Sequence, residues 1–357
     1  MRGRHLLLLL LATLAGLSTL ACRQPHGVGG PSGAAASNAD FKPLQFRLGQ
    51  SAAVGSLLNE SGNEFVGEVD RATRGAVKGT VYPAGQLASQ QELIERLQLG
   101  DLEIAVSSSV FVGAMPEFGI FELPYAFENR DEVKRAVDGP LGHELAAQAD
   151  KHNLVLLGYW ENGFRHITNN VRPIRTPADL RGLRIRTPAD PDRIELFQAW
   201  GARPSPLDLS LLFNSLKAGV FDGQENPTSQ IVSQRLNEVQ HYVSLTGHIY
   251  SPSYVIASKQ WWESLDPRLQ TVVLNAVGTT ADNSRRRGEE ADHDAAAKLA
   301  ELGMQVNDDV DKSAFQSASA PIYAEYEKRF GLHLLQLLEE ATGRTAPTAA
   351  DVRRDPQ

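Results

Sequence analysis

The chain has 357 residues, long enough for two domains of ordinary size with a substantial core. Its hydrophobic fraction of 42% and charged fraction of 22% are typical of a globular protein. A formal net charge of -8, with no local basic stripe, argues against nucleic acid as a partner, because little in the chain would neutralise phosphates.

Residues 1–21 have the pattern of a signal peptide, with two early arginines followed by an apolar stretch too short to span a bilayer comfortably. The only cysteine, Cys22, comes directly afterwards, so no intramolecular disulfide can form. A cysteine in this place resembles the lipidated cysteine of bacterial lipoproteins and predicts a membrane anchor. The alternative is simple secretion, with cleavage near Ala21 and an incidental thiol. Residues 22–40 are rich in Gly, Pro, Ser and Ala, which predicts a flexible tether.

Strand and helix patterns alternate from residue 44 onward, which predicts sheets flanked by helices. Period-two and continuous apolar patterns predict strands at 44–49, 77–82, 102–106, 154–157, 183–186, 239–246 and 253–258. Helical spacing and capping residues predict helices at 65–72, 91–99, 131–151 with a break near 139–140, 190–201, 208–219, 266–303, 315–330 and 332–342. Two further helix starts are predicted at Ala202–Leu207 and at Asn226–Pro227.

At this length, the alternation predicts an α/β protein with two domains and a cleft between them. The strands at 239–246 and 253–258 are expected to cross between the domains, and the long helix from 266 to bridge them. The predicted organisation is a signal peptide 1–21, a tether 22–40, domain I at 41–164 plus 250–265, domain II at 165–249, bridging and closing helices at 266–342, and a loose tail at 343–357.

The chain lacks the motifs of common enzymes and metal sites. It has no Gly-x-Ser-x-Gly elbow, Cys-x-x-Cys, phosphate loop or His-Glu-x-x-His, so we predict a binding protein without catalytic, metal or cofactor residues. Asp308, Asp309 and Asp311 lack the glycine and closing glutamate of a calcium loop, and we interpret them as a solvated helix start. Lone histidines such as His166 and His248 are expected to be structural.

A small set of donors suited to a carboxylate comes from three separate segments. Arg186 ends a predicted strand, where a guanidinium can hold a carboxylate through two parallel hydrogen bonds. Arg165 follows a buried strand, and Asn226 can donate to and accept from a hydroxyl or carboxylate. Each has a plainer alternative: a surface arginine for Arg186, an ion pair with Glu161 or another acid for Arg165, and a helix cap for Asn226.

Several landmark segments follow one another along the chain: Val81–Leu87, Leu97–Ala105, Phe121–Phe127, Gly163–Arg165, Pro177–Arg186 and Gly219–Pro227. Each alone is a weak signal. Their order resembles that in the DctP-type solute-binding subunits of tripartite ATP-independent periplasmic (TRAP) transporters, and the resemblance covers residues 44–335.

The resemblance implies a two-domain clamshell like that of periplasmic binding proteins, with mixed sheets, hinge strands and a long domain-spanning helix. It implies that the signature arginine, which pairs with the ligand carboxylate, is Arg186. An asparagine at 226, where some relatives have tryptophan, implies the branch that binds sugar acids or dicarboxylates without a cation. The complete set of expected ligand-binding residues is Arg165, Arg186, Glu225, Asn226, Ser108 and Gln50.

The predicted function is therefore capture of a small organic acid outside the cytoplasm and its delivery to the membrane permease of a TRAP transporter. The predicted location is the periplasm, with membrane contact only through lipid on Cys22. The same fold and pocket would also suit a lipid-anchored sensor that presents an organic acid to a receptor kinase. A secreted hydrolase is disfavoured by the missing nucleophile and metal motifs.

Overall fold

The strands form two sheet regions that share one long strand. In the computed structural model, which describes residues 41–345, the 16-residue strand β4 (Leu154–Asn169) contributes to both regions. Its first part pairs with β9 (Tyr250–Ser258), and its last part pairs with β7 (Gly223–Pro227) and β8 (Tyr242–Ser244). All three pairings are antiparallel, so β4 connects the two regions as a continuous element.

The first sheet region runs in the order β2-β1-β3-β9-β4. Its outer strands are β1 (Leu44–Gly49), β2 (Val77–Tyr82) and β3 (Ile104–Ser107), and β1 lies parallel to both of its neighbours. The second region continues from β4 through β7 to β5 (Arg184–Thr187) and β6 (Arg203–Pro206). On the other side of β4, β8 pairs in parallel with β10 (Gln305–Asn307).

Helices cover these strands and enclose three clusters of buried apolar side chains. Helices α1 and α9 cover the cluster that contains Phe65 and Trp160, and α6, α7 and α10 cover the one around Leu212. The largest cluster lies beneath α2 to α5, α11 and α12. The helices are α1 (Leu57–Ala72), α2 (Gln90–Leu99), α3 (Arg130–Asp138), α4 (Pro140–Asp150), α5 (Pro191–Ala199), α6 (Leu212–Lys217), α7 (Thr228–Ser233), α8 (Lys259–Ser264), α9 (Pro267–His293), α10 (Ala295–Glu301), α11 (Lys312–Phe330) and α12 (His333–Thr342). Short 3-10 turns include η1 (Ser109–Gly113), η2 (Pro116–Glu122), η3 (Pro177–Leu180), η4 (Leu209–Leu211) and η5 (Leu236–Glu238).

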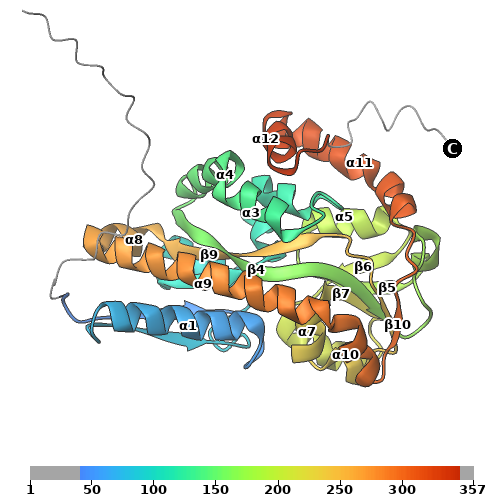
Figure 1. Ribbon diagram of the computed structural model, residues 1–357, viewed down its shortest axis with the longest axis horizontal. Helices are drawn as coiled ribbons and strands as arrows, with labels where there is room; N and C mark the ends of the chain where they lie inside the picture. The colour runs from blue at the N-terminus through green and yellow to red at the C-terminus, as the bar shows by residue number, and fades with distance from the viewer. Residues whose placement is uncertain (1–40, 346–357) are drawn as a thin grey trace, which may run out of the picture. The chain divides into compact units, whose positions relative to one another are not determined.

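Helix α9 is the longest element and runs alongside β4, from α8 at one end to α10 at the other (Figure 1). It begins at the N-cap Asp266, as the sequence predicts, but ends at His293 instead of continuing to residue 303. Residue Asp294 separates it from α10. Among residues 41–345, no helix is both long enough and apolar enough to cross a membrane.

Two predicted helix starts are wrong. Residues 203–206 form strand β6, because their backbone pairs with β5 despite two prolines. Asn226 lies inside strand β7, and Pro227 is the N-cap of α7. Asn226 is therefore not a helix cap, and its side chain is available for other contacts. Both errors come from reading proline as a helix signal where it stands at an edge strand or a strand end.

Candidate functional site

A small cavity of about 30 Å³ lies where the two sheet regions meet, and three of the predicted site residues line it. These are Gln50, which follows β1, Ser108, which follows β3, and Asn226 of β7. Strand ends of an open α/β sheet are the usual place for ligands. A volume of this size holds about two or three water molecules, since one water needs roughly 10–15 Å³. An organic acid can therefore enter only if the cleft opens.

Arg165 adjoins this cavity through Asn226 and is held by Glu225. Its Nε donates to Glu225 Oε2 at 2.5 Å, and its Nη2 donates to Glu225 Oε1 at 2.9 Å. The same Nη2 also donates to Asn226 Oδ1 at 3.0 Å and to the Glu225 backbone carbonyl at 2.7 Å. Arg165 thus fixes the position of the Asn226 amide, which donates in turn to Gln224 Oε1 at 2.5 Å.

Arg193 is a third buried arginine and it connects two carboxylates. It lies on α5, is fully buried, and donates from Nη1 to Glu225 Oε2 at 2.5 Å and from Nη2 to Glu122. Burial lowers the pKa of Arg193, but the charges of Glu225 and Glu122 outweigh it and the pKa is raised overall. For Glu225, burial raises the pKa, yet Arg165 and Arg193 hold it well below its usual range. Glu225 is therefore an ionised, buried carboxylate.

His248 completes the surroundings of Glu225. Its Nε2 lies 3.2 Å from Glu225 Oε2 and, because a carboxylate can only accept, Nε2 carries the proton and donates. Its Nδ1 accepts from Thr246 Oγ1 at 2.8 Å. Burial lowers the pKa of His248 to about 4, although Glu225 raises it, so the ring is neutral at pH 7. This histidine has a structural environment, as the sequence predicts.

Arg186 differs from the other two buried arginines, because its partner is a carbonyl. It is 2% exposed, and both Nε and Nη2 donate to the Leu207 carbonyl oxygen, Nε at 2.8 Å. Within residues 41–345, Nη1 makes no hydrogen bond and no carboxylate forms an ion pair with Arg186. Burial lowers the pKa of this guanidinium to about 10, with Glu225 opposing that shift. The chain therefore keeps one poorly solvated positive charge beside the cavity.

The structure brings Gln50, Ser108 and Asn226 to one cavity, while neither Arg165 nor Arg186 lines it directly. Arg186 adjoins it through the segment from Leu207 to Leu209, since Leu209 is a lining residue. Cys22 lies outside the described residues.

The sequence prediction missed Arg193 and Glu122. A signal for Arg193 existed, because residues 193, 196, 197 and 200 form one helical stripe whose other members are apolar. An arginine on such a stripe must find buried partners. Glu122 carries no comparable local signal.

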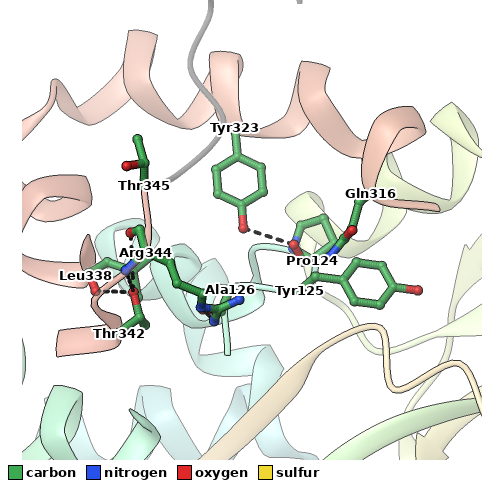
Figure 2. Close-up of a pocket in the computed structure, with 9 residues that line it drawn as sticks. All are labelled: Pro124, Tyr125, Ala126, Gln316, Tyr323, Leu338, Thr342, Arg344 and Thr345. Carbon is green, nitrogen blue, oxygen red and sulfur yellow. Dashed lines mark hydrogen bonds between the residues drawn. The ribbon is translucent and has the colours of Figure 1, made fainter. Parts of the chain in front are cut away.

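A larger hollow of about 260 Å³ lies near the end of α12 and contains none of the predicted site residues (Figure 2). Tyr323 of α11 points across it and donates from its hydroxyl to the Pro124 carbonyl at 2.9 Å. Arg344 at its edge pairs with Glu128 and Glu132. Three of the expected ligand-binding residues, Gln50, Ser108 and Asn226, line the smaller cavity instead.

Comparison with known proteins agrees with this fold. The family model for bacterial extracellular solute-binding proteins, family 7 (DctP) matches residues 37–329. A solute-binding protein of Verminephrobacter eiseniae is 34% identical over 296 residues, which cover 83% of this chain and 88% of the relative.

Solved structures of TRAP periplasmic solute-binding proteins are also similar. One from a Polaromonas species, bound to D-erythronate, has a TM-score of 0.81 and 30% identity, covering 85% of this chain and 99% of the other. One from Sulfurospirillum deleyianum, with bound succinate, has a TM-score of 0.78 and 29% identity, covering 84% and 99%. The fold is thus the two-domain α/β clamshell of periplasmic binding proteins. The chain is a binding protein, not an enzyme, and it belongs to the DctP family of TRAP transporter solute-binding proteins.

Proposed function

We propose that this protein captures a small organic acid by pairing Arg186 with the acid's carboxylate, and that it delivers the acid to a TRAP membrane permease. The observation that carries the proposal is the buried Arg186 guanidinium, which has no carboxylate partner in residues 41–345. A buried charge without a counter-ion is costly, and a ligand carboxylate would supply that counter-ion. Bound erythronate and succinate in similar proteins support an organic acid as the ligand.

The other predicted site residues have supporting roles in this proposal. Arg165 and Asn226 form the side of the site that Glu225 holds in place through its hydrogen bonds to Arg165. Glu225 therefore positions its neighbours, because its carboxylate oxygens already accept from the protein. Gln50 and Ser108 line the opposite wall of the cavity and would contact the remainder of the ligand.

Binding requires the cleft to open and close. We infer that domain I (41–164 and 250–265) and domain II (165–249) move about β4 and β9, with α9 spanning both. One hydrogen bond that such an opening would break joins the two proposed domains: the backbone N–H of Gln90 at the start of α2 donates to Asp208 at 3.4 Å. A ligand that bridges both sides would shift the population toward the closed form.

The test is calorimetric titration with a panel of sugar acids, dicarboxylates, 2-oxo acids and amino acids. Losing the charge partner of a buried carboxylate typically costs about 3–5 kcal/mol, so Arg186→Ala should weaken binding roughly a hundredfold or more. The matched control is Arg184→Ala, two residues earlier on β5, which is exposed and pairs with Asp222. It should bind within threefold of the parent. An Arg186→Ala variant with unchanged affinity would contradict the proposal.

We propose further that the mature protein is in the periplasm and is held to a membrane by lipid on Cys22. The position of this only cysteine after an apolar N-terminal stretch supports the anchor. Mass spectrometry of protein extracted from membranes with detergent should show a lipid-modified N-terminus. The Cys22→Ser variant should appear in the soluble periplasmic fraction. An unmodified cysteine in protein already soluble without detergent would rule the anchor out.

A further inference from the structure

The cavity beside Arg186 has a purely neutral lining. Its twelve lining residues include no Asp, Glu, Lys, Arg or His. They comprise amides, hydroxyls and a few apolar groups: Gln50, Ser51, Ala52, Leu58, Gln90, Val106, Ser107, Ser108, Asn162, Leu209, Asn226 and Gln230. The part of a ligand that reaches beyond Arg186 and Arg165 would therefore meet dipoles and not charges.

Several of these polar groups are buried and have no hydrogen-bond partner within the described residues 41–345. Both atoms of the Gln50 side-chain amide, the Ser51 hydroxyl and Gln230 Oε1 are in this state, and the three residues are 1–5% exposed. Buried polar groups are normally paired, so unpaired ones around a cavity indicate the groups a ligand must supply. An amide offers one donor side and one acceptor side. A hydroxyl group can form a hydrogen bond with either side of an amide, because it both donates and accepts, whereas a carboxylate only accepts.

Of the three buried arginines around the site, Arg186 alone has no carboxylate partner within residues 41–345, so it can accept one ligand anion. Three buried guanidiniums, those of Arg165, Arg186 and Arg193, face two buried carboxylates, those of Glu122 and Glu225. His248 is neutral, as argued above. Burial, reinforced by the charge of Glu122, raises the pKa of Asp190 well above its usual value, and within residues 41–345 this buried carboxyl forms no ion pair with any of the three arginines. Asp208, near Arg186, is half-buried at the edge of the cleft, where water screens it.

From the neutral cavity, its unpaired dipoles and the one buried arginine that has no ion pair within residues 41–345, we propose that the ligand is a monocarboxylate bearing several hydroxyl groups and that a second carboxylate is rejected. This inference rests on the proposed function and narrows the organic acid to one class. A second carboxylate would lose its water in a region with no cation, and it would face the acceptor oxygens of Gln50 and Gln230 without a proton to offer.

The experiment compares matched acids by calorimetric titration at pH 7.5. An aldonate and the aldarate of the same sugar share every stereocentre and differ only in a terminal hydroxymethyl group or carboxylate. We would measure such pairs with four, five and six carbons, together with butyrate and succinate, which lack hydroxyls. At least one aldonate should bind about ten- to a hundredfold more tightly than its aldarate and than butyrate. The free-energy cost of leaving buried polar groups unpaired corresponds to a change in affinity of that size.

The outcomes separate this inference from the proposed function. Succinate or an aldarate could bind as tightly as every aldonate, and Arg186→Ala could abolish that binding. This result would overturn the monocarboxylate inference but would still agree with the proposed capture of an organic acid. Butyrate matching the aldonates would overturn the role of the hydroxyls. No binding of any acid, in folded protein, would overturn both.

Two variants test the wall that recognises hydroxyls. Gln50→Leu replaces the amide with an aliphatic group, so it should weaken aldonate binding about tenfold or more while leaving butyrate binding unchanged. Gln91→Leu on the surface of α2, one residue from the lining residue Gln90, is the control and should change neither. Gln230→Lys supplies the missing cation and should raise affinity for the aldarate relative to the aldonate. Circular dichroism and thermal unfolding establish that each variant is folded; equal aldonate affinity in a folded Gln50→Leu protein would overturn the assignment.

Discussion

Glu225 is the residue on which most of the buried polar contacts near the cavity converge. Two arginines and one histidine contact its carboxylate, which is completely buried. One of these arginines also orients Asn226, so the carboxylate acts on the ligand site through its partners. Because Arg165 and Arg193 compensate its charge, the Glu225 carboxylate can lie near a site that we propose binds a negatively charged ligand.

Replacing Glu225 with glutamine should strongly destabilise the protein. The change keeps the shape but leaves Arg165 and Arg193 with less compensation in a buried region, which typically costs about 3–5 kcal/mol. Urea unfolding would measure the loss. The control is Glu290→Gln, which removes an exposed pair with Arg286 on α9 and should cost less than about 1 kcal/mol. Equal stabilities for the two variants would show that the buried cluster is not important for folding.

His248 should make the stability depend on pH in mildly acidic solution. Its pKa is lowered by burial to about 4 in the folded protein, against a reference value of 6.5. As pH falls below 6.5, the unfolded chain takes up the proton first, so the folded state loses stability until pH reaches about 4. One such group changes the free energy of unfolding by at most about 1.4 kcal/mol per pH unit.

Urea unfolding at several pH values between 7.5 and 4.5 tests this prediction. The His248→Gln variant should show a shallower loss of stability across that interval than the parent protein. His166 also has its pKa lowered by burial to about 4, so both histidines contribute to the pH dependence of the parent protein's stability. Only the difference between the parent and the His248→Gln variant reports on His248. Identical slopes would contradict the assignment.

At the scale of elements, helix α2 places residues of the cavity wall. Its N-cap Ser89 accepts from the Glu92 backbone N–H, and the Glu92 side chain accepts from the Ser89 N–H, which forms a capping box. The next residue, Gln90, accepts through Oε1 from the Ser107 hydroxyl at 3.2 Å and the Ser108 N–H at 3.3 Å. The start of the helix thus fixes the end of β3.

Ser89→Ala should therefore lower the free energy of unfolding by about 1 kcal/mol, within the usual range of about 0.5–2 kcal/mol for a lost cap. Thermal or urea unfolding would measure the change. Gln91→Ala lies two residues further along and leaves both capping bonds intact, so it should be close to neutral. A Ser89→Ala protein as stable as that control would show that the capping box contributes little here.

How far the sequence predicts this fold depends on whether an element is defined locally. The start of α9 has a clear local signal in Asp266–Pro267, and the strand pattern of residues 183–186 correctly places Arg186 in β5. Asn226 was misplaced on a helix because β7 is defined by pairing with β4 and β5, which are distant in sequence. The partners of Arg193 are likewise non-local, since Glu122 comes 71 residues earlier.

At the scale of the whole molecule, the site is assembled from segments on both sides of a cleft. Loop residue Gly85 of proposed domain I faces Ser210 of proposed domain II, so that a Cβ added at Gly85 would lie 3.6 Å from the Ser210 Cβ. That separation falls within the 3.5–4.5 Å spanned by the Cβ atoms of a disulfide. A Gly85→Cys, Ser210→Cys pair in a Cys22→Ser background would therefore join the two sides in the closed form.

The crosslinked protein should be unable to take up ligand. Because the closed cavity of about 30 Å³ has no room for an organic acid to enter, oxidation before ligand is added should abolish binding, and a reductant should restore it. Oxidation after ligand is bound should instead trap the ligand and slow its release. Both single-cysteine variants are controls, and Gly85→Cys also reports the strain of a side chain at position 85, where φ is +71°. Rapid binding by the fully oxidised double variant would show that the acid reaches its site without the clamshell opening, and would require a different entry path from the one the fold suggests.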